Sequence, residues 1–160
     1  MSEASSSENL TRVVHATFEL FFSLHVESAP QNELESLLSD DDIRGGVVHI
    51  LGDWIGSVAY RCSKALASTL TARIYDCELK QVTDKQVDDT LREISNMIGG
   101  NLKSVLGESC ILSTPKTLRE INSPSGVQEG KRIAYLAFRC EGEPFEVSLY
   151  ESGISVPSAS

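Results

Sequence analysis

The sequence predicts an α+β fold in which antiparallel β-hairpins pack against three main helices. Apolar residues recur at helical spacing in three separate segments, whereas two other segments contain paired, alternating runs joined by short turns. The strands therefore come in antiparallel pairs, which argues against the strand–helix alternation of a doubly wound sheet. The length of 160 residues suits one domain, and an apolar content of 41% allows a packed core.

The first helix is expected over residues 9–27. Apolar residues recur at helical spacing from Leu10 to Leu24, and Pro30 follows shortly afterwards. The next segment, 31–42, is polar and acidic, so we expect a solvated loop there, with a short helical turn as the alternative.

The two ends of the chain are polar. Residues 1–9 have neither the basic region nor the apolar region of a secretory signal. We expect residues 1–9 and 153–160 to be disordered tails on either side of one domain at 10–152.

The first hairpin is expected over residues 46–61, with Gly52 and Asp53 in its turn. β-branched and aromatic residues are frequent on both sides of this turn, as in strands. Ser63 can then cap a second helix that runs to about Tyr75.

The third helix has the clearest boundaries. Thr83 and Gln86 have the spacing of a capping box, and Gly107 is suited to end a helix. We therefore expect a helix over residues 84–106.

The residue pattern of the C-terminal part of the sequence predicts β-strands. A strand is expected around residues 111–118, and a turn-rich segment follows at 122–126. Two alternating runs, 132–139 and 145–150, are joined by residues 141–144 and predict a second hairpin.

Charge and composition exclude several classes of function. The net charge of −9 is opposite to what a duplex-binding surface or an anionic membrane requires, so we expect neither partner. Charged and polar residues interrupt the most apolar stretch, 18–26, so no membrane-spanning helix is expected. The four cysteines are widely spaced and form no metal-binding pair, which favours reduced, buried thiols in a cytoplasmic protein. They are Cys62, Cys77, Cys110 and Cys140.

The third helix has two different faces when it is projected at about 100° per residue. Its apolar face is formed by Val87, Leu91, Ile94, Ile98, Leu102 and Val105. Asn101 lies at the margin of this face, where a structural hydrogen bond is its default role. Glu93 and Asn96 lie one turn apart on the outer face, with Gly100 a turn below Asn96 and Gly99 beside it.

The outer face alone is a weak functional signal. A carboxylate and a carboxamide at this spacing are also found on ordinary solvated helices. The paired glycines are more informative, because each costs about 1 kcal/mol relative to alanine in a helix. A helix tolerates this cost where another molecule approaches its backbone or where it bends.

The segment 93–103, EISNMIGGNLK, preceded by Val87-Asp88-Asp89, resembles the active helix of the CheC/CheX family, phosphatases of the chemotaxis response regulator CheY. The resemblance covers roughly residues 10–151 and implies a CheC-like fold. Two-site members of the family carry a second Glu-x-x-Asn on the first helix. Here Phe22 follows Glu19 at that spacing, so the chain resembles the single-site CheX type.

The resemblance implies the following chemistry. The chain would hydrolyse the aspartyl phosphate of a CheY-like receiver domain, with Asn96 positioning the water and Glu93 pairing with a receiver lysine. Gly99 and Gly100 would permit close approach, and Lys103 would contact the partner. No cofactor is expected on this chain, since Mg²⁺ would be held by the receiver. CheX-type relatives associate through their sheets, so a homodimer is also expected.

Two other functions remain open from the sequence. The chain could be a non-catalytic module of the same fold that binds a receiver or assembles with switch-type proteins. It could also be an unrelated ligand-binding domain. His15, His25 and His49 have no spacing that suits a metal site, so each is expected to be structural.

Overall fold

The computed structural model describes residues 3–107, 109–122 and 130–152. Within these ranges the chain forms a seven-stranded antiparallel sheet and four α-helices. The strands are β1 (Glu27–Ser28), β2 (Ile43–Leu51), β3 (Gly56–Ser63), β4 (Ile111–Leu112), β5 (Lys116–Thr117), β6 (Lys131–Cys140) and β7 (Glu143–Glu151). The helices are α1 (Glu3–Phe22), α2 (Glu33–Leu37), α3 (Lys64–Tyr75) and α4 (Asp84–Leu106), with 3-10 turns η1 (Asp40–Asp42) and η2 (Leu79–Gln81).

The sheet has the strand order β1-β6-β7-β3-β2-β4, and β5 also pairs with β2. Both expected hairpins are present: β2 pairs with β3, and β6 pairs with β7. The second hairpin turns at Glu141 and Gly142, whose φ angles of 53° and 76° are left-handed. The expected α+β class with three main helices is therefore confirmed, and those helices are α1, α3 and α4.

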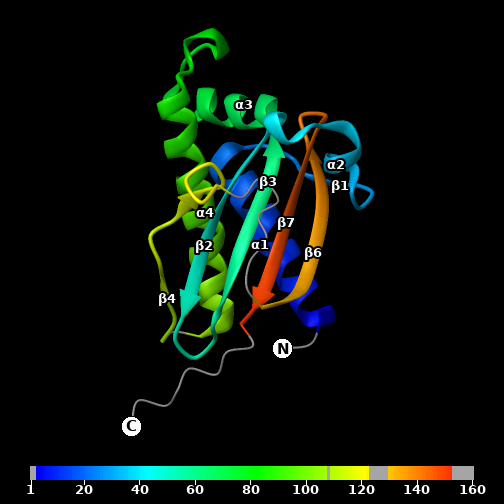
Figure 1. The fold of residues 1–160 in the computed structure, drawn as a ribbon, viewed down its shortest axis with the longest axis vertical. Helices are drawn as coiled ribbons and strands as arrows, with labels where there is room; N and C mark the ends of the chain where they lie inside the picture. Colours follow the sequence, from blue (N-terminus) through cyan, green and yellow to red (C-terminus); the bar gives the residue numbers. More distant parts are fainter. Residues whose placement is uncertain (1–2, 108, 123–129, 153–160) are drawn as a thin grey trace.

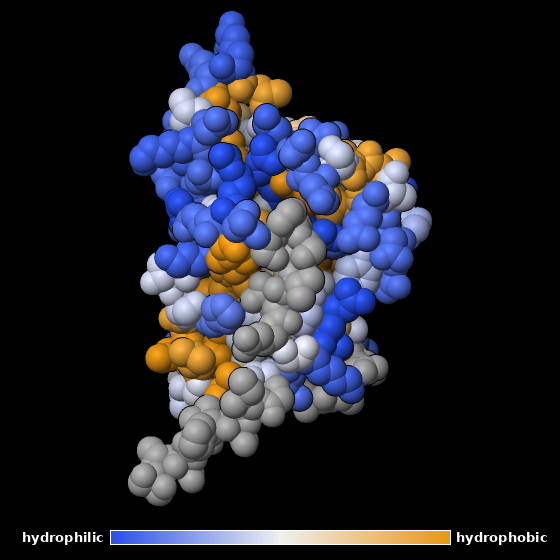
Figure 2. Space-filling view, viewed as in Figure 1, coloured by the Kyte–Doolittle hydropathy of each residue, from blue (hydrophilic) through white to orange (hydrophobic). Residues whose placement is uncertain are grey.

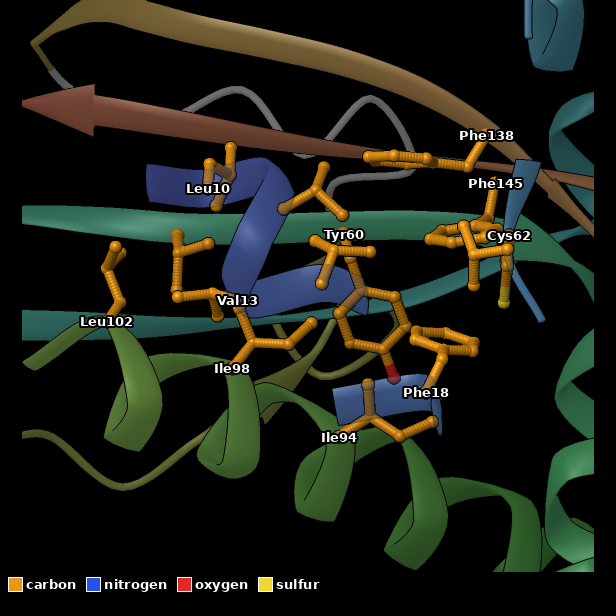
Figure 3. Packing of buried hydrophobic residues seen from close by; sticks show 14 of the residues in the cluster. Leu10, Val13, Phe18, Tyr60, Cys62, Ile94, Ile98, Leu102, Phe138 and Phe145 are labelled. Atoms are coloured by element: carbon orange, nitrogen blue, oxygen red, sulfur yellow. The ribbon is translucent and has the colours of Figure 1, made fainter. Parts of the chain in front are cut away.

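The main core lies between the sheet and the long helices. In Figure 1, α1 and α4 run side by side behind the sheet, and α3 crosses near one end. Side chains from α1, α4 and the inner face of the sheet meet in one cluster (Figure 3). Phe18 of α1 stacks on Phe145 of β7 at 4.8 Å between ring centroids, and Phe145 stacks on Phe138 of β6 at 5.1 Å. This core fixes α4 against the sheet.

The first helix differs from the expectation. It starts at Glu3, so residues 3–9 are helical and not part of a disordered tail. It also ends earlier, at Phe22, because Ser23 adopts a left-handed φ of 55°. The buried side chain of Leu24 therefore belongs to the connection and not to the helix. The expected tail at 153–160 lies outside the described residues.

The expected strand at 111–118 is also corrected. The structure has two short strands, β4 and β5, separated by an irregular stretch that contains Pro115. The whole segment still follows β2: the Ser113 amide donates to the His49 carbonyl at 2.9 Å, and the Leu118 amide donates to the Gly45 carbonyl at 3.0 Å. We call residues 111–120 the strap. Of the expected turn at 122–126, only Asn122 lies within the described residues.

The surface seen in Figure 2 is mostly hydrophilic. An apolar area at its lower left lies over β4 and the end of β2, where the cross-strand neighbours Leu51 and Ile111 are both exposed. No helix in the described parts of the chain is long and apolar enough to span a membrane.

Candidate active site

Helix α4 forms as its sequence predicts. The Thr83 hydroxyl accepts a hydrogen bond from the Gln86 amide at 3.2 Å, and the Gln86 side chain accepts one from the Thr83 amide at 3.0 Å. At the other end, Gly107 has a φ of 140° and its amide donates to the Lys103 carbonyl at 3.1 Å. The helix therefore has the expected start and end.

The inner face of α4 is fully buried along most of its length. Leu91, Ile94, Ile98 and Leu102 are at most 1% exposed. Val105, expected on the same face, is 47% exposed, so the buried stripe ends one turn earlier than predicted.

Helix α4 approaches the sheet closely because small residues face each other. A Cβ atom on Gly46 of β2 would lie 2.4 Å from the Ser95 hydroxyl oxygen. A Cβ atom on Gly99 would lie 2.8 Å from Val48 Cγ1. Larger side chains at these positions would push the helix away from β2.

The position of Gly99 corrects one expectation. Gly99 is buried and faces the sheet, so it does not share the outer face of α4 with Gly100. Gly100 is exposed, and a Cβ atom there would meet nothing within 4 Å. The two glycines thus have different structural positions: one allows helix–sheet packing and the other leaves a bare patch on the surface.

A buried hydrogen bond also anchors α4. The Tyr60 hydroxyl, which points from β3 toward α4 (Figure 3), donates to the Leu91 carbonyl at 2.8 Å. Burial raises the pKa of Tyr60 well above 10, so this donor stays protonated. The sequence gives no signal for this contact, because the two residues are 31 positions apart.

The outer face of α4 presents the two candidate residues together. Glu93 and Asn96 are both exposed, one turn apart. Neither side chain has a hydrogen-bond or ion-pair partner among the residues that the structure describes. Lys103, two turns beyond Asn96, is half-buried. The carboxylate and the carboxamide are therefore available to another molecule.

Asn101 lies on the side of α4 that faces α1. Its side-chain amide donates to the Thr17 hydroxyl at 3.2 Å, as suits the expected structural role. The Thr17 hydroxyl in turn donates to the Val13 carbonyl at 2.8 Å.

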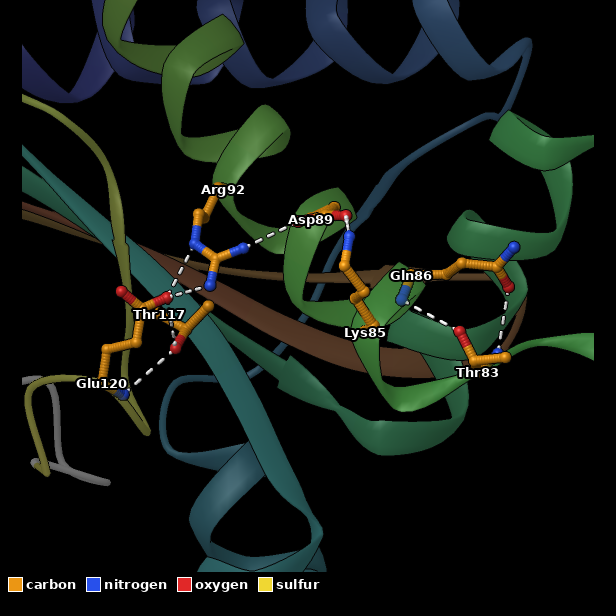
Figure 4. Close-up of polar contacts among 7 residues, drawn as sticks. All are labelled: Thr83, Lys85, Gln86, Asp89, Arg92, Thr117 and Glu120. Carbon is orange, nitrogen blue, oxygen red and sulfur yellow. Dashed lines mark hydrogen bonds and ion pairs between the residues drawn. The ribbon is translucent and has the colours of Figure 1, made fainter.

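An ion-pair network lies next to the candidate residues (Figure 4). Arg92 donates to Asp89 at 2.8 Å and to Glu120 of the strap at 2.7 Å, while Lys85 donates to Asp89 at 3.2 Å. Partial burial acts to raise the pKa of Glu120, but the hydrogen bonds and charge of Arg92 outweigh it and lower that pKa overall. Sequence reasoning missed this network because Glu120 is 28 residues from Arg92.

Glu93 and Asn96 line neither of the two hollows found among the described residues. These hollows, of about 480 and 520 Å³, lie near the first turns of α3 and α4, where they share Arg44, Lys64, Asp84 and Arg119. Glu93 and Asn96 are instead exposed on the outer face of α4. An exposed helix face suits a macromolecular substrate that holds the reacting group in its own pocket.

The histidines and cysteines have no metal-binding arrangement in the part of the chain that the structure describes. His15 and His25 each lie 3.9 Å from Glu19, and His49 is exposed on β2. Within the described residues, no three His, Cys, Asp or Glu side chains are arranged to hold a metal ion. All four cysteines are free thiols.

Comparison with known proteins identifies similar chains. Residues 44–138 match the model of a family described as Chemotaxis phosphatase CheX. No curated protein matches the chain.

Solved structures share the fold. The chemotaxis protein CheX from Vibrio vulnificus is 18% identical, with a TM-score of 0.70 over 94% of this chain and 98% of that chain. CheX from Desulfovibrio desulfuricans is 16% identical, with a TM-score of 0.67 over 91% and 97%. The CheX-CheY-BeF3-Mg complex from Borrelia burgdorferi matches at 17% identity, with a TM-score of 0.68 over 91% and 96%.

Proposed function

Since this chain belongs to the chemotaxis phosphatase CheX family, we propose that it hydrolyses the aspartyl phosphate of a CheY-like receiver domain. The observation that carries the proposal is the exposed pair Glu93 and Asn96, whose side chains lie one turn apart on the outer face of α4 without partners in the described structure. The Borrelia complex supports the choice of partner, because there a CheX protein is bound to CheY together with beryllofluoride and Mg²⁺.

Asn96 is proposed to position the water. The transition state of phosphoryl transfer is loose, so the reaction depends on alignment more than on base strength. A carboxamide takes no proton at neutral pH, but its oxygen can accept a hydrogen bond from the water. The water oxygen attacks phosphorus, the bond to the aspartyl oxygen breaks, and the aspartate leaves as a carboxylate. One proton of the water passes to a phosphoryl oxygen and the other stays on the attacking oxygen, so the products are the aspartate carboxylate and inorganic phosphate.

Glu93 is proposed to dock the helix. Its carboxylate would pair with the lysine of the receiver's phosphorylation pocket, which fixes the register of α4 over the phosphoryl group. Gly100 would help, because the absence of a side chain below Asn96 leaves room for the partner. Mg²⁺ would be supplied by the receiver, and no metal is required on this chain.

The test is phosphate release from a phosphorylated CheY-like receiver. We expect Asn96→Ala to lower the rate about 100-fold while it still binds the receiver. Glu93→Gln should weaken binding about 30-fold, because the receiver lysine loses its charged partner. Glu19→Gln removes an exposed carboxylate from α1 and is the matched control, with wild-type behaviour expected.

Two outcomes would contradict the proposal. Hydrolysis by Asn96→Ala at the wild-type rate would exclude the positioning role of Asn96. Tight binding of the receiver by the wild-type chain without any phosphate release would favour the non-catalytic receiver-binding module.

Two further parts of the proposal concern assembly and location. We propose a homodimer formed through sheet edges, and β6 offers one: β1 pairs with only Arg139 and Phe138 of this strand. Sedimentation at micromolar concentration tests it, and a monomer would exclude it. A cytoplasmic location is proposed because receiver domains act there.

A further inference from the structure

A second carboxylate lies on the outer face of α4, in line with the candidate residues. Asp89 precedes Glu93 by four residues and Asn96 by seven, so it lies about 6 Å and about 10 Å before them along the helix axis. At about 100° per residue, Asp89 points within about 20° of the direction of Asn96, whereas Asp88 points about 80° away from it. The side chain of Asp89 is 40% exposed. A partner that binds Glu93 therefore also meets Asp89.

The two carboxylates differ in their own contacts. Asp89 binds Arg92 at 2.8 Å and Lys85 at 3.2 Å (Figure 4). Arg92 also binds Glu120 of the strap. Glu93 has no ion pair or hydrogen bond among the described residues. The network therefore neutralises the carboxylates of Asp89 and Glu120 and leaves that of Glu93 free.

The residues around Asp89 repeat the spacing of the candidate pair. Arg92 follows Asp89 by three residues, as Asn96 follows Glu93. A receiver lysine that paired with Asp89 would shift the receiver by about 6 Å along α4 and bring Arg92 to the place of Asn96. A guanidinium has donors only, so it cannot accept a hydrogen bond from the attacking water. Because phosphoryl transfer depends on alignment, this register would bind the receiver without releasing phosphate.

We propose that Arg92 is a positioning residue that prevents the receiver from binding one helical turn out of register. Together with Lys85 it occupies the carboxylate of Asp89, so that Glu93 is the carboxylate left for the receiver lysine. The two bound cations weaken the attraction of a third cation to Asp89, and Glu93 has no such competition. This inference rests on the proposed function, because it requires a receiver lysine that pairs with a carboxylate of α4.

The experiment maps this contact by carbodiimide cross-linking, which joins a lysine amine to a carboxylate that it touches. The probe is a CheY-like receiver activated with beryllofluoride and Mg²⁺ and mixed with the full chain, and mass spectrometry of the digested product identifies the linked residues. We expect the wild-type chain to be linked through Glu93. In Lys85→Ala/Arg92→Ala, Asp89 should take about half of the cross-link, because the two free carboxylates then bind the lysine with similar affinity.

The same double variant should have a kinetic signature with the phosphorylated receiver. Binding in a second, unproductive register lowers kcat and KM by the same factor and leaves kcat/KM unchanged. With equal occupation of the two registers, this factor is about two. A loss of alignment within the productive register would instead lower kcat and kcat/KM together.

Two control variants separate the register from other effects of the substitutions. Lys85→Ala/Asp89→Asn/Arg92→Ala lacks the freed carboxylate and should return the cross-link to Glu93, which would also show that the helix still folds. Glu120→Gln removes the charge that Arg92 contacts on the strap but leaves Arg92 on Asp89. We expect Glu120→Gln to be cross-linked as the wild-type chain is.

Each outcome of the cross-linking decides the role of Arg92. A cross-link through Asp89 in the double variant and not in the wild-type chain supports it. The role is overturned if the double variant is linked through Glu93 alone, if the wild-type chain is linked through Asp89, or if Glu120→Gln shifts the cross-link as the double variant does. If the wild-type chain does not bind the activated receiver, the proposed function fails and the role of Arg92 fails with it. If both chains are linked through Glu93 and release phosphate with equal kcat, only the role of Arg92 fails.

Discussion

Two small residues decide how deeply α4 lies on the sheet. Gly46 and Ser95 face each other across the interface between β2 and α4, and the Ser95 hydroxyl is buried without a hydrogen-bond partner among the described residues. An unpaired buried hydroxyl is unfavourable by about 1–3 kcal/mol. The residue next to it is Asn96, so the packing that buries Ser95 also sets the height of the candidate site above the sheet.

We expect Ser95→Ala to raise the free energy of unfolding by about 1 kcal/mol, because it removes the unpaired hydroxyl and favours the helix. Chemical denaturation measures this effect. A less stable Ser95→Ala would mean that the hydroxyl has a partner in solution.

Gly46→Ala should have the opposite effect. We expect the free energy of unfolding to fall by about 1–3 kcal/mol, because the added methyl group overlaps the Ser95 hydroxyl. The loss should be smaller in a Ser95→Ala background, since the overlapping atom is gone. Losses that simply add in the double variant would show that the two positions do not interact.

The element that depends most on distant contacts is the strap. Its two short strands pair with β2 over two residues each, so side-chain contacts to α4 contribute to its position. Arg92 and Glu120 provide one such contact next to the candidate residues.

We expect Arg92→Ala to loosen the strap while α4 stays helical. Amide hydrogens of residues 116–120 should exchange faster, with a small loss of stability because the ion pair is near the surface. Lys85→Ala is the control, since Lys85 binds Asp89 without contacting the strap. Unchanged exchange in the strap would assign its position to the pairing with β2 alone.

The ion pair between Arg92 and Glu120 also predicts that the stability of the fold depends on pH. The pKa of Glu120 in the folded state is below its ordinary value of 4.5, so its contribution to stability is present above pH 4.5. It is lost as the pH falls through the lowered pKa. The wild-type chain should therefore be more stable than Arg92→Ala above about pH 4.5 and lose this difference in stability below it, as acid denaturation can measure.

At the scale of the whole molecule, burial controls the reactivity of the cysteine thiols. Burial raises the pKa of Cys62 to about 12 and that of Cys140 to about 11, and both side chains lie in the core. Cys110 is also buried, whereas Cys77 is half-buried. Raised pKa values and burial together make a thiol unreactive.

We expect alkylation of the native chain at pH 8 to modify Cys77 first. The other three thiols should react only after unfolding, which mass spectrometry of the digested chain can follow. Modification of Cys62 as fast as Cys77 would contradict the packing of β3 against α3 and α4.

The sequence alone determined the fold class, the two hairpins and the boundaries of α4, because these depend on local periodicity, turn residues and caps. It also placed Glu93, Asn96 and Gly100 on one exposed face, since that follows from the helical repeat. The tertiary structure alone decided that Gly99 faces Val48 and that the strap lies beside α4. These features depend on contacts between residues far apart in the chain, such as Arg92 with Glu120 and Tyr60 with Leu91, and no local pattern encodes them.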